Sequence, residues 1–133
     1  MTIRTSPETV FNRHLLVELE HHLKDMPHQI FRIESNLTRQ GIPDIYCCVN
    51  GRSFWIETKV DDNELAALQW SWHKQHQYAK GRSFIIYSNK EGYRIVTGDK
   101  YYTLRTIFEA VRLILRTVEE DAALGGHRYK EDA

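Results

Sequence analysis

The first quarter of the chain carries apolar residues at the spacing of a helix. They recur every four residues and therefore fall on one stripe: Phe11, Leu15, Leu19 and Leu23. Ser6 and Pro7 come just before this stripe, and a Ser cap followed by Pro is typical of a helix start. We therefore predict a helix that begins after Ser6 and ends near Asp25.

After this helix the pattern changes to short runs that are typical of strands. We predict strands at residues 29–34, 43–49 and 53–60, with a polar loop after the first. Asn50 and Gly51 separate the second strand from the third. Asn-Gly between apolar runs predicts a two-residue hairpin, because both central positions of a type I′ turn need a positive φ.

The rest of the chain predicts a helix, two short strands and a last helix, at residues 62–80, 83–87, 93–97 and 102–123. The order αβββαββα predicts an α/β (α+β) fold in which helices flank a mixed β-sheet. The 133 residues suit one domain, and no repeat or linker divides them. We expect a single domain over residues 1–124 and a polar C-terminal tail over residues 125–133.

The hairpin turn fixes which residues of the two strands face each other. Counting outward from the turn places Ile45 opposite Ile56 on an apolar face, and Asp44 opposite Glu57 on the other face. Two acids in cross-strand register, with Cβ atoms roughly 5 Å apart, are destabilising unless something compensates. A shared proton is one compensation, and a divalent cation such as Mg²⁺ is another. Lys59 lies on the same face and could stabilise charge on an attacking water or a phosphate.

A plainer interpretation of these three residues is also open. Asp44 and Glu57 could be solvated surface acids that Lys59 neutralises. The following residues favour a functional site over solvated surface acids. The next predicted helix is amphipathic and should help to cover this strand.

A longer motif surrounds these residues. Gly41-Ile-Pro-Asp44 precedes the Asn-Gly hairpin, Glu57-Thr-Lys59 follows it, and the next helix carries Leu68-Gln69. This arrangement resembles the PD-(D/E)XK nuclease superfamily, and in particular its VRR-NUC branch of small phage and bacterial nucleases, which is related to Holliday junction resolvases. The resemblance covers roughly residues 8–97 and implies a restriction-endonuclease-like core.

The resemblance also implies roles for individual residues. Asp44 and Glu57 would be metal ligands, joined by the backbone carbonyl of Thr58. Lys59 would orient the water or stabilise the transition state, and Gln69 would be the polar helix residue near the active site, although it could also be an ordinary helix amide. The implied cofactor is Mg²⁺, with Mn²⁺ expected to substitute.

Members of this family often add a Glu from the first helix as a further ligand. Glu8 is the preferred candidate because it lies on the buried stripe, and Glu18 is the alternative. Glu20 and Glu34 are weaker candidates. Each of these could instead be a solvated acid, and Glu8 would in any case be favourable at a helix N-terminus.

The 18 basic and 18 acidic residues balance, yet their distribution does not. From Lys74 to Arg116 there are nine bases and three acids. Backbone phosphates respond to such local basic surface rather than to the sum over the chain. We expect DNA contacts from the bases of the second half and of the loop before the hairpin: Arg39, Lys74, Lys80 and Arg82.

Other side chains that could carry chemistry lack a matching motif. His73 and His76 have no HExxH or CxxC partner pattern, so we interpret them as solvated helix histidines rather than zinc ligands. Trp70 and Trp72 are interpreted as packing residues. No P-loop or GxGxxG sequence predicts a nucleotide cofactor, and no uncharged run is long enough to cross a membrane.

Together these observations predict a metal-dependent deoxyribonuclease. We expect an endonuclease that hydrolyses phosphodiester bonds in double-stranded or branched DNA, such as a Holliday junction. A homodimer would suit a two-fold substrate. The absence of a secretory signal predicts a cytoplasmic protein, or a phage protein in the host cytoplasm. The alternative is a nucleic-acid-binding or protein-interaction module that keeps a nuclease fold without catalysis.

Overall fold

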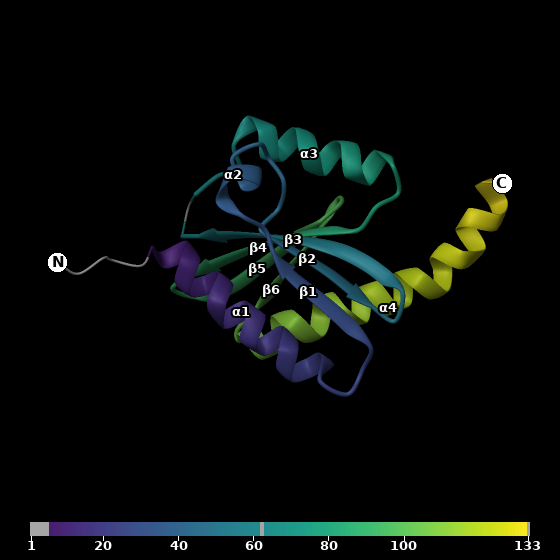
Figure 1. Ribbon diagram of the computed structural model, residues 1–133, viewed down its shortest axis with the longest axis horizontal. Helices are drawn as coiled ribbons and strands as arrows, with labels where there is room; N and C mark the ends of the chain where they lie inside the picture. The colour runs from purple at the N-terminus through teal and green to yellow at the C-terminus, as the bar shows by residue number, and fades with distance from the viewer. Residues whose placement is uncertain (1–5, 62, 133) are drawn as a thin grey trace.

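A six-stranded β-sheet separates two layers of helices (Figure 1). The computed structural model describes residues 6–61 and 63–132, and the side chains among them as far as Asp121. Its elements in chain order are α1 (Pro7–Leu23), β1 (His28–Arg32), α2 (Ser35–Thr38), β2 (Ile45–Val49), β3 (Arg52–Val60), α3 (Ala67–Tyr78), β4 (Ser83–Asn89), β5 (Gly92–Thr97), β6 (Lys100–Leu104) and α4 (Ile107–Asp132).

The strands lie in the sheet in their order along the chain, from β1 to β6. Every neighbouring pair is antiparallel except β3 and β4, which are parallel. Parallel neighbours need a crossover connection, and α3 provides it across one face of the sheet. Helices α1 and α4 pack on the opposite face and against each other (Figure 1).

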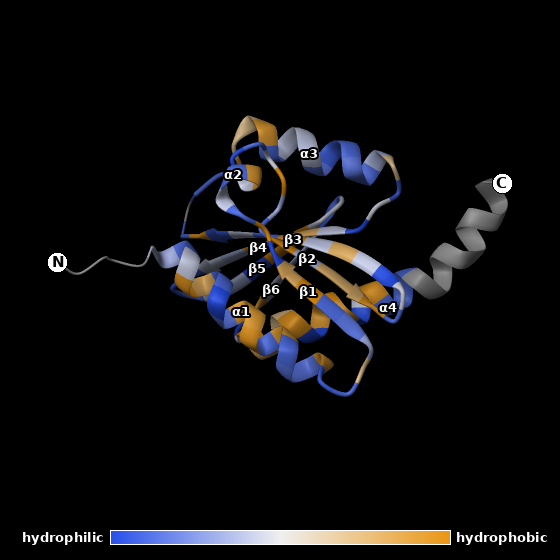
Figure 2. Cartoon of the chain, viewed as in Figure 1, coloured by the Kyte–Doolittle hydropathy of each residue, from blue (hydrophilic) through white to orange (hydrophobic). Residues whose placement is uncertain are grey.

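The hydrophobic core lies between the sheet and the layer of α1 and α4. The predicted stripe of α1 is buried there, together with the apolar faces of β2, β3 and β4. Figure 2 shows hydrophobic residues along α1 and the first turns of α4, whereas much of α3 is hydrophilic. Among the residues of α3, only His73 is buried. The layer between the sheet and α3 is therefore the polar one, and it holds the acids of the hairpin.

The predicted hairpin register is confirmed. Val49 pairs with Arg52, and Ile45 pairs with Ile56. Asn50 and Gly51 both have positive φ, as the turn requires. The turn therefore determines that β2 pairs with β3, and that apolar and polar side chains lie on opposite faces of this pair.

Four elements differ from the prediction. The helix α3 begins at Ala67, whereas the predicted helix began at residue 62. The strand β6 occupies residues that were predicted to begin the last helix, because Gly98, with a φ of +60°, lets the chain turn back after β5. The short helix α2 occupies part of the predicted polar loop. The helix α4 continues past Gly125, where we predicted a polar tail.

The loop before β2 depends on a glycine. Gly41 has a φ of +96°, and a Cβ atom at this position would lie 2.6 Å from the backbone oxygen of Leu68. Positive φ disfavours other residues, and the close approach leaves no room for a side chain. Gly41 thereby holds the loop that ends at Asp44 against α3.

We predict that Gly41→Ala destabilises the protein more than Gly51→Ala. Both positions have positive φ, which costs a residue with a Cβ about 1–2 kcal/mol. Only Gly41 also faces a backbone atom, since nothing lies within 4 Å of a Cβ at Gly51. Urea denaturation measures both variants, and equal losses of unfolding free energy would contradict the packing of this loop on α3.

Candidate active site

Residues from five parts of the chain line one cavity of about 280 Å³ between the sheet and α3. They include the five side chains that the sequence analysis preferred for catalysis or metal binding, together with one of the predicted DNA contacts: Glu8, Arg39, Asp44, Glu57, Lys59 and Gln69. We call this cavity the acidic pocket. The hairpin brings three of these residues together, α1 brings one and α3 another.

Asp44 lies directly before β2 and is held by β3. Its Oδ2 atom accepts hydrogen bonds from the backbone N–H of Thr58, at 2.8 Å, and from the Thr58 hydroxyl, at 2.9 Å. The amide of Asn12 in α1 donates in turn to the same hydroxyl, at 2.9 Å. These bonds fix the carboxylate of Asp44 at the end of the hairpin.

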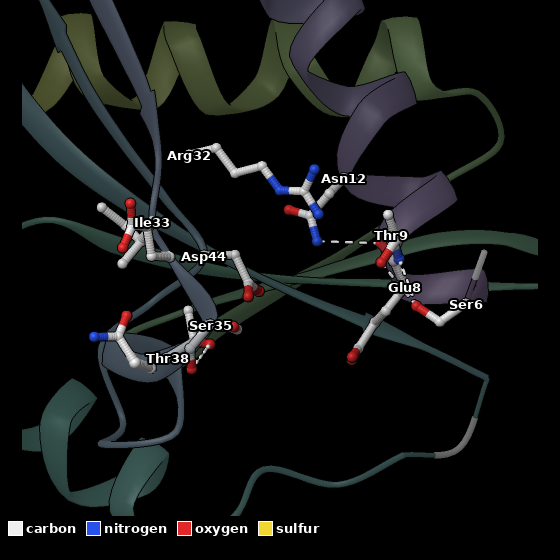
Figure 3. Close-up of a pocket in the computed structure, with 11 residues that line it drawn as sticks. Ser6, Glu8, Thr9, Asn12, Arg32, Ile33, Ser35, Thr38 and Asp44 are labelled. Carbon is white, nitrogen blue, oxygen red and sulfur yellow. Dashed lines mark hydrogen bonds between the residues drawn. The ribbon is translucent and has the colours of Figure 1, made fainter. Parts of the chain in front are cut away.

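Figure 3 shows a second, adjoining pocket, which residues of α1, β1 and α2 line. Glu8 and Asp44 both direct their carboxylates into it, and Asn12 and Arg32 also line it. This pocket shares Glu8 and Asp44 with the acidic pocket. The two acids are therefore accessible from the open pocket beside α1.

Glu57 is the buried acid of the site, with 1% of its surface exposed. Burial is the largest cause that raises the pKa of Glu57 from 4.5 to about 10, and the adjacent Asp44 carboxylate raises it further. The shift favours the protonated form of Glu57 when no cation is bound. Its Oε1 atom has no hydrogen-bond partner among the described residues.

His73 is buried next to Glu57. The prediction that His73 is a solvated helix histidine is therefore wrong. The ring is 1% exposed, and its Nδ1 atom shares a hydrogen bond of 3.0 Å with the Ser83 hydroxyl. Its Nε2 atom lies 3.7 Å from Oε1 of Glu57, and neither atom has a hydrogen-bond partner in the described part of the chain. Burial lowers the pKa of His73 to about 4, so the ring is neutral.

Our prediction did not include His73 or Asn12, although the sequence contains a signal for each. His73 follows Gln69 by four residues, which places the two on one side of a helix. Asn12 follows Glu8 by the same spacing and sits within the apolar stripe of α1. A polar residue at such a position needs a partner, and Thr58 is that partner.

The structure separates the two candidate acids of the first helix. Glu8 lines the acidic pocket, with its Oε1 atom 3.9 Å from the ammonium of Lys59. Burial raises the pKa of Glu8, while Lys59 opposes the shift. Glu18 instead bonds His22, and Glu20 bonds His28, at 3.2 and 2.9 Å. The geometry thus favours Glu8 as the neighbour of Asp44 and Glu57.

Gln69 has a structural task as well as a place in the pocket. Its Oε1 atom accepts a hydrogen bond of 2.8 Å from the backbone N–H of Ala66. This bond caps the first turn of α3, where an N–H group would otherwise lack a partner. The cap holds the amide of Gln69 at the wall of the acidic pocket.

The four predicted DNA contacts do not form one surface around the pocket. Arg39 lines it, whereas Lys74 lies over the ring of Trp70 at 5.8 Å. Arg82 forms an ion pair of 2.7 Å with Asp121, and it lines a separate cavity together with Lys80. Any shared role of these bases in binding DNA therefore stays a prediction.

The donors of the acidic pocket suit a hard divalent cation, since carboxylate oxygens are the ligands that Mg²⁺ prefers. A cation could replace the proton of Glu57 and supply its unpartnered oxygen with a bond. The described side chains do not form a ready cluster of three acidic, His or Cys ligands. Binding of a metal ion would have to draw the carboxylates of Glu8, Asp44 and Glu57 together.

Comparison with known proteins places the fold. No family model and no curated protein matches the sequence. The structure is similar to that of Hjc, a Holliday junction resolvase from the archaeal hyperthermophile Archaeoglobus fulgidus, with a TM-score of 0.51 and 19% identity over 80% of this chain and 87% of that one. The chain therefore has a restriction-endonuclease-like fold, which confirms the predicted fold class. None of the helices in the described part of the chain could span a membrane.

We predict that Glu57→Gln removes a pH dependence of stability in the metal-free protein. The folded pKa of about 10 lies above the unfolded value, so the folded state binds more protons between about pH 4.5 and 10, and wild type loses stability as the pH rises through this range. Urea denaturation in EDTA at about pH 5 and about pH 9 should show a smaller loss for Glu57→Gln.

The exposed residue Glu91 provides the matched control. Glu91→Gln makes the same chemical change on the β4–β5 turn and should keep the pH dependence of wild type. If Glu57→Gln and wild type lose equal stability between the two pH values, Glu57 does not carry the buried proton.

Proposed function

We propose that this chain is a divalent-metal-dependent DNA endonuclease of the VRR-NUC type. The observation that carries the proposal is the buried carboxyl group of Glu57, which lines one pocket with the carboxylate of Asp44 that Thr58 fixes. A buried acid beside a second carboxylate is costly unless a proton or a cation compensates, and here the two acids lie in a pocket that also contains a lysine. The restriction-endonuclease-like fold supports the same proposal.

The proposed ligands of the cation are the carboxylates of Asp44, Glu57 and Glu8, with the backbone carbonyl of Thr58. A bound Mg²⁺ or Mn²⁺ would supply an activated water and stabilise negative charge on the phosphate. Glu57 gives up its proton when the cation binds, because a ligating carboxylate must be ionised. Asp44 remains oriented by its two bonds to Thr58, so one ligand is fixed in advance.

Lys59 has the complementary role in this proposal. Its ammonium group is largely buried and lies near Glu8, within the wall of the pocket. There it can orient the attacking water or stabilise the charge that develops on the phosphate oxygens. Arg39 and Gln69 line the same pocket, and in this proposal they contact the DNA backbone.

The proposed substrate is double-stranded or branched DNA, cleaved within the strand. A homodimer would present two such pockets to a substrate with two-fold symmetry, as a four-way junction has. The structural neighbour Hjc is a Holliday junction resolvase, which makes branched DNA the first substrate to test.

Both cysteines are free thiols, in agreement with a reducing compartment such as the cytoplasm.

The proposal predicts metal-dependent cleavage that requires the acidic pocket. Purified protein should nick supercoiled plasmid and four-way junctions with Mg²⁺ or Mn²⁺, and EDTA should stop the reaction. Asp44→Ala, Glu57→Gln and Lys59→Met should each lower the rate by about 100-fold or more, because each removes a ligand or a charge at the phosphate. Gel electrophoresis of the products measures these rates.

Glu91→Gln again serves as the control, since it changes an exposed acid away from the pocket and should cleave as wild type does. DNA binding without cleavage under any metal condition would contradict the enzyme and favour the non-catalytic binding module. Cleavage that survives Asp44→Ala would place the active site elsewhere.

A further inference from the structure

Five rings form a continuous row on the face of the sheet that carries Glu57. The row starts at the edge strand β1 and ends on α3: Phe31, Tyr46, Trp55, Trp72 and His76. Their centroids are separated by 6.3, 4.9, 5.3 and 4.6 Å in that order. We call these five residues the aromatic row.

The strand register explains the first three members of the row. Phe31 pairs with Tyr46, and Tyr46 pairs with Trp55, so the three side chains form one rung across β1, β2 and β3. The residues on either side of Trp55 are Phe54 and Ile56, which are fully buried in the core with α1 and α4. The rung therefore projects from the opposite face, toward α3, where Trp72 packs on Trp55.

The row becomes exposed only at one end. Trp55 and Trp72 are partly covered, whereas Phe31 on the edge strand is 51% exposed. The rings of Phe31 and Tyr46 are inclined by only 29° to each other, so their faces are close to parallel. The uncovered end thus presents a flat ring that is supported from behind by a second one.

The strand register places the rung of Phe31, Tyr46 and Trp55 two residues along the strands from Asp44 and Glu57. Glu57 follows Trp55 by two residues on the same face of β3, a rise of about 6.6 Å along the strand. Asp44 precedes Tyr46 by the same number of residues. A nucleic-acid strand whose backbone enters the acidic pocket would therefore carry its neighbouring base over Tyr46 and Phe31.

We infer that Phe31, backed by Tyr46, stacks on an unpaired base next to the cleaved phosphate. A base inside a duplex has both faces covered by its neighbours, so only a base released from the stack can lie on the ring. Stacking on an aromatic side chain tolerates any base. The inference rests on the proposed function and deepens it, because it makes the substrate class DNA with unpaired nucleotides at the cleavage site.

The surroundings of the row favour a base over a protein partner. The exposed apolar surface here is one ring on a short edge strand, between the polar residues Gln29 and Arg32. A stable protein interface needs roughly 800 Å² on each partner. A single base fits the available surface.

The test compares Phe31→Ala with Phe108→Ala. Phe108 is a matched control because it is 46% exposed but lies on α4, in the layer on the other face of the sheet. Each protein is titrated in EDTA, which prevents metal-dependent cleavage, into a blunt DNA duplex and into the same duplex with a single-stranded arm. Fluorescence anisotropy measures the dissociation constants.

Wild type and Phe108→Ala should bind the duplex with the arm more tightly than the blunt duplex. Phe31→Ala should weaken binding to the arm-bearing duplex by about 5- to 150-fold and leave blunt-duplex binding unchanged. Phe31→Trp should keep the preference, and abasic sites in the arm should mimic Phe31→Ala. Thermal unfolding checks that each variant folds.

Three results would overturn the inference: no preference for the arm in wild type, an equal loss on both DNAs in Phe31→Ala, or a change of oligomeric mass in Phe31→Ala with an unchanged preference. The last result would assign Phe31 to a contact between two copies of the chain. Cleavage assays with metal separate this failure from that of the proposed function. Cleavage without a role for Phe31 refutes only the stacking. Phe31-dependent binding without cleavage refutes the enzyme, and with it a base beside a cleaved phosphate, and leaves Phe31 as a stacking residue of a binding module.

Discussion

Two carboxyl groups held together beneath a helix are the constraint on which the site depends. Asp44 is fixed as an acceptor by the N–H and hydroxyl groups of Thr58, and Glu57 beside it is buried with a pKa of about 10. The metal-free protein meets this constraint by keeping a proton on Glu57. A cation could meet it by replacing the proton, and this exchange links the fold to the proposed chemistry.

Each layer of the fold supports part of this arrangement. The α1 layer contributes Asn12, which supports the Thr58 hydroxyl, and Glu8, which approaches Lys59. The α3 layer contributes His73, whose ring closes off Glu57 from water, and Gln69. The parallel pair of β3 and β4 requires α3 to cross above β3, so the topology itself covers the acids. The aromatic row then continues from the same covered face to the solvent at the edge strand.

The sequence predicted those parts of the site that depend on local geometry. The Asn-Gly turn set the register of the hairpin, and with it the positions of Asp44, Glu57 and Lys59. The apolar stripe of α1 placed Glu8 correctly on the inward side. His73 and Asn12 were missed because their partners, Glu57 and Thr58, come from elements distant in the sequence. The strand β6 was missed because its two tyrosines are compatible with a helix start, and only pairing with β5 decides between the two.

The most direct test of this account is the count of protons released when a cation binds. Calorimetric titration of the metal-free protein with Mn²⁺ near neutral pH, in buffers of different ionisation enthalpy, measures this number. We predict saturable binding with release of about one proton by wild type, because Glu57 must ionise to become a ligand, and no such release by Glu57→Gln. Saturable binding to wild type without proton release, or no binding at all, would contradict the exchange of a buried proton for a metal ion.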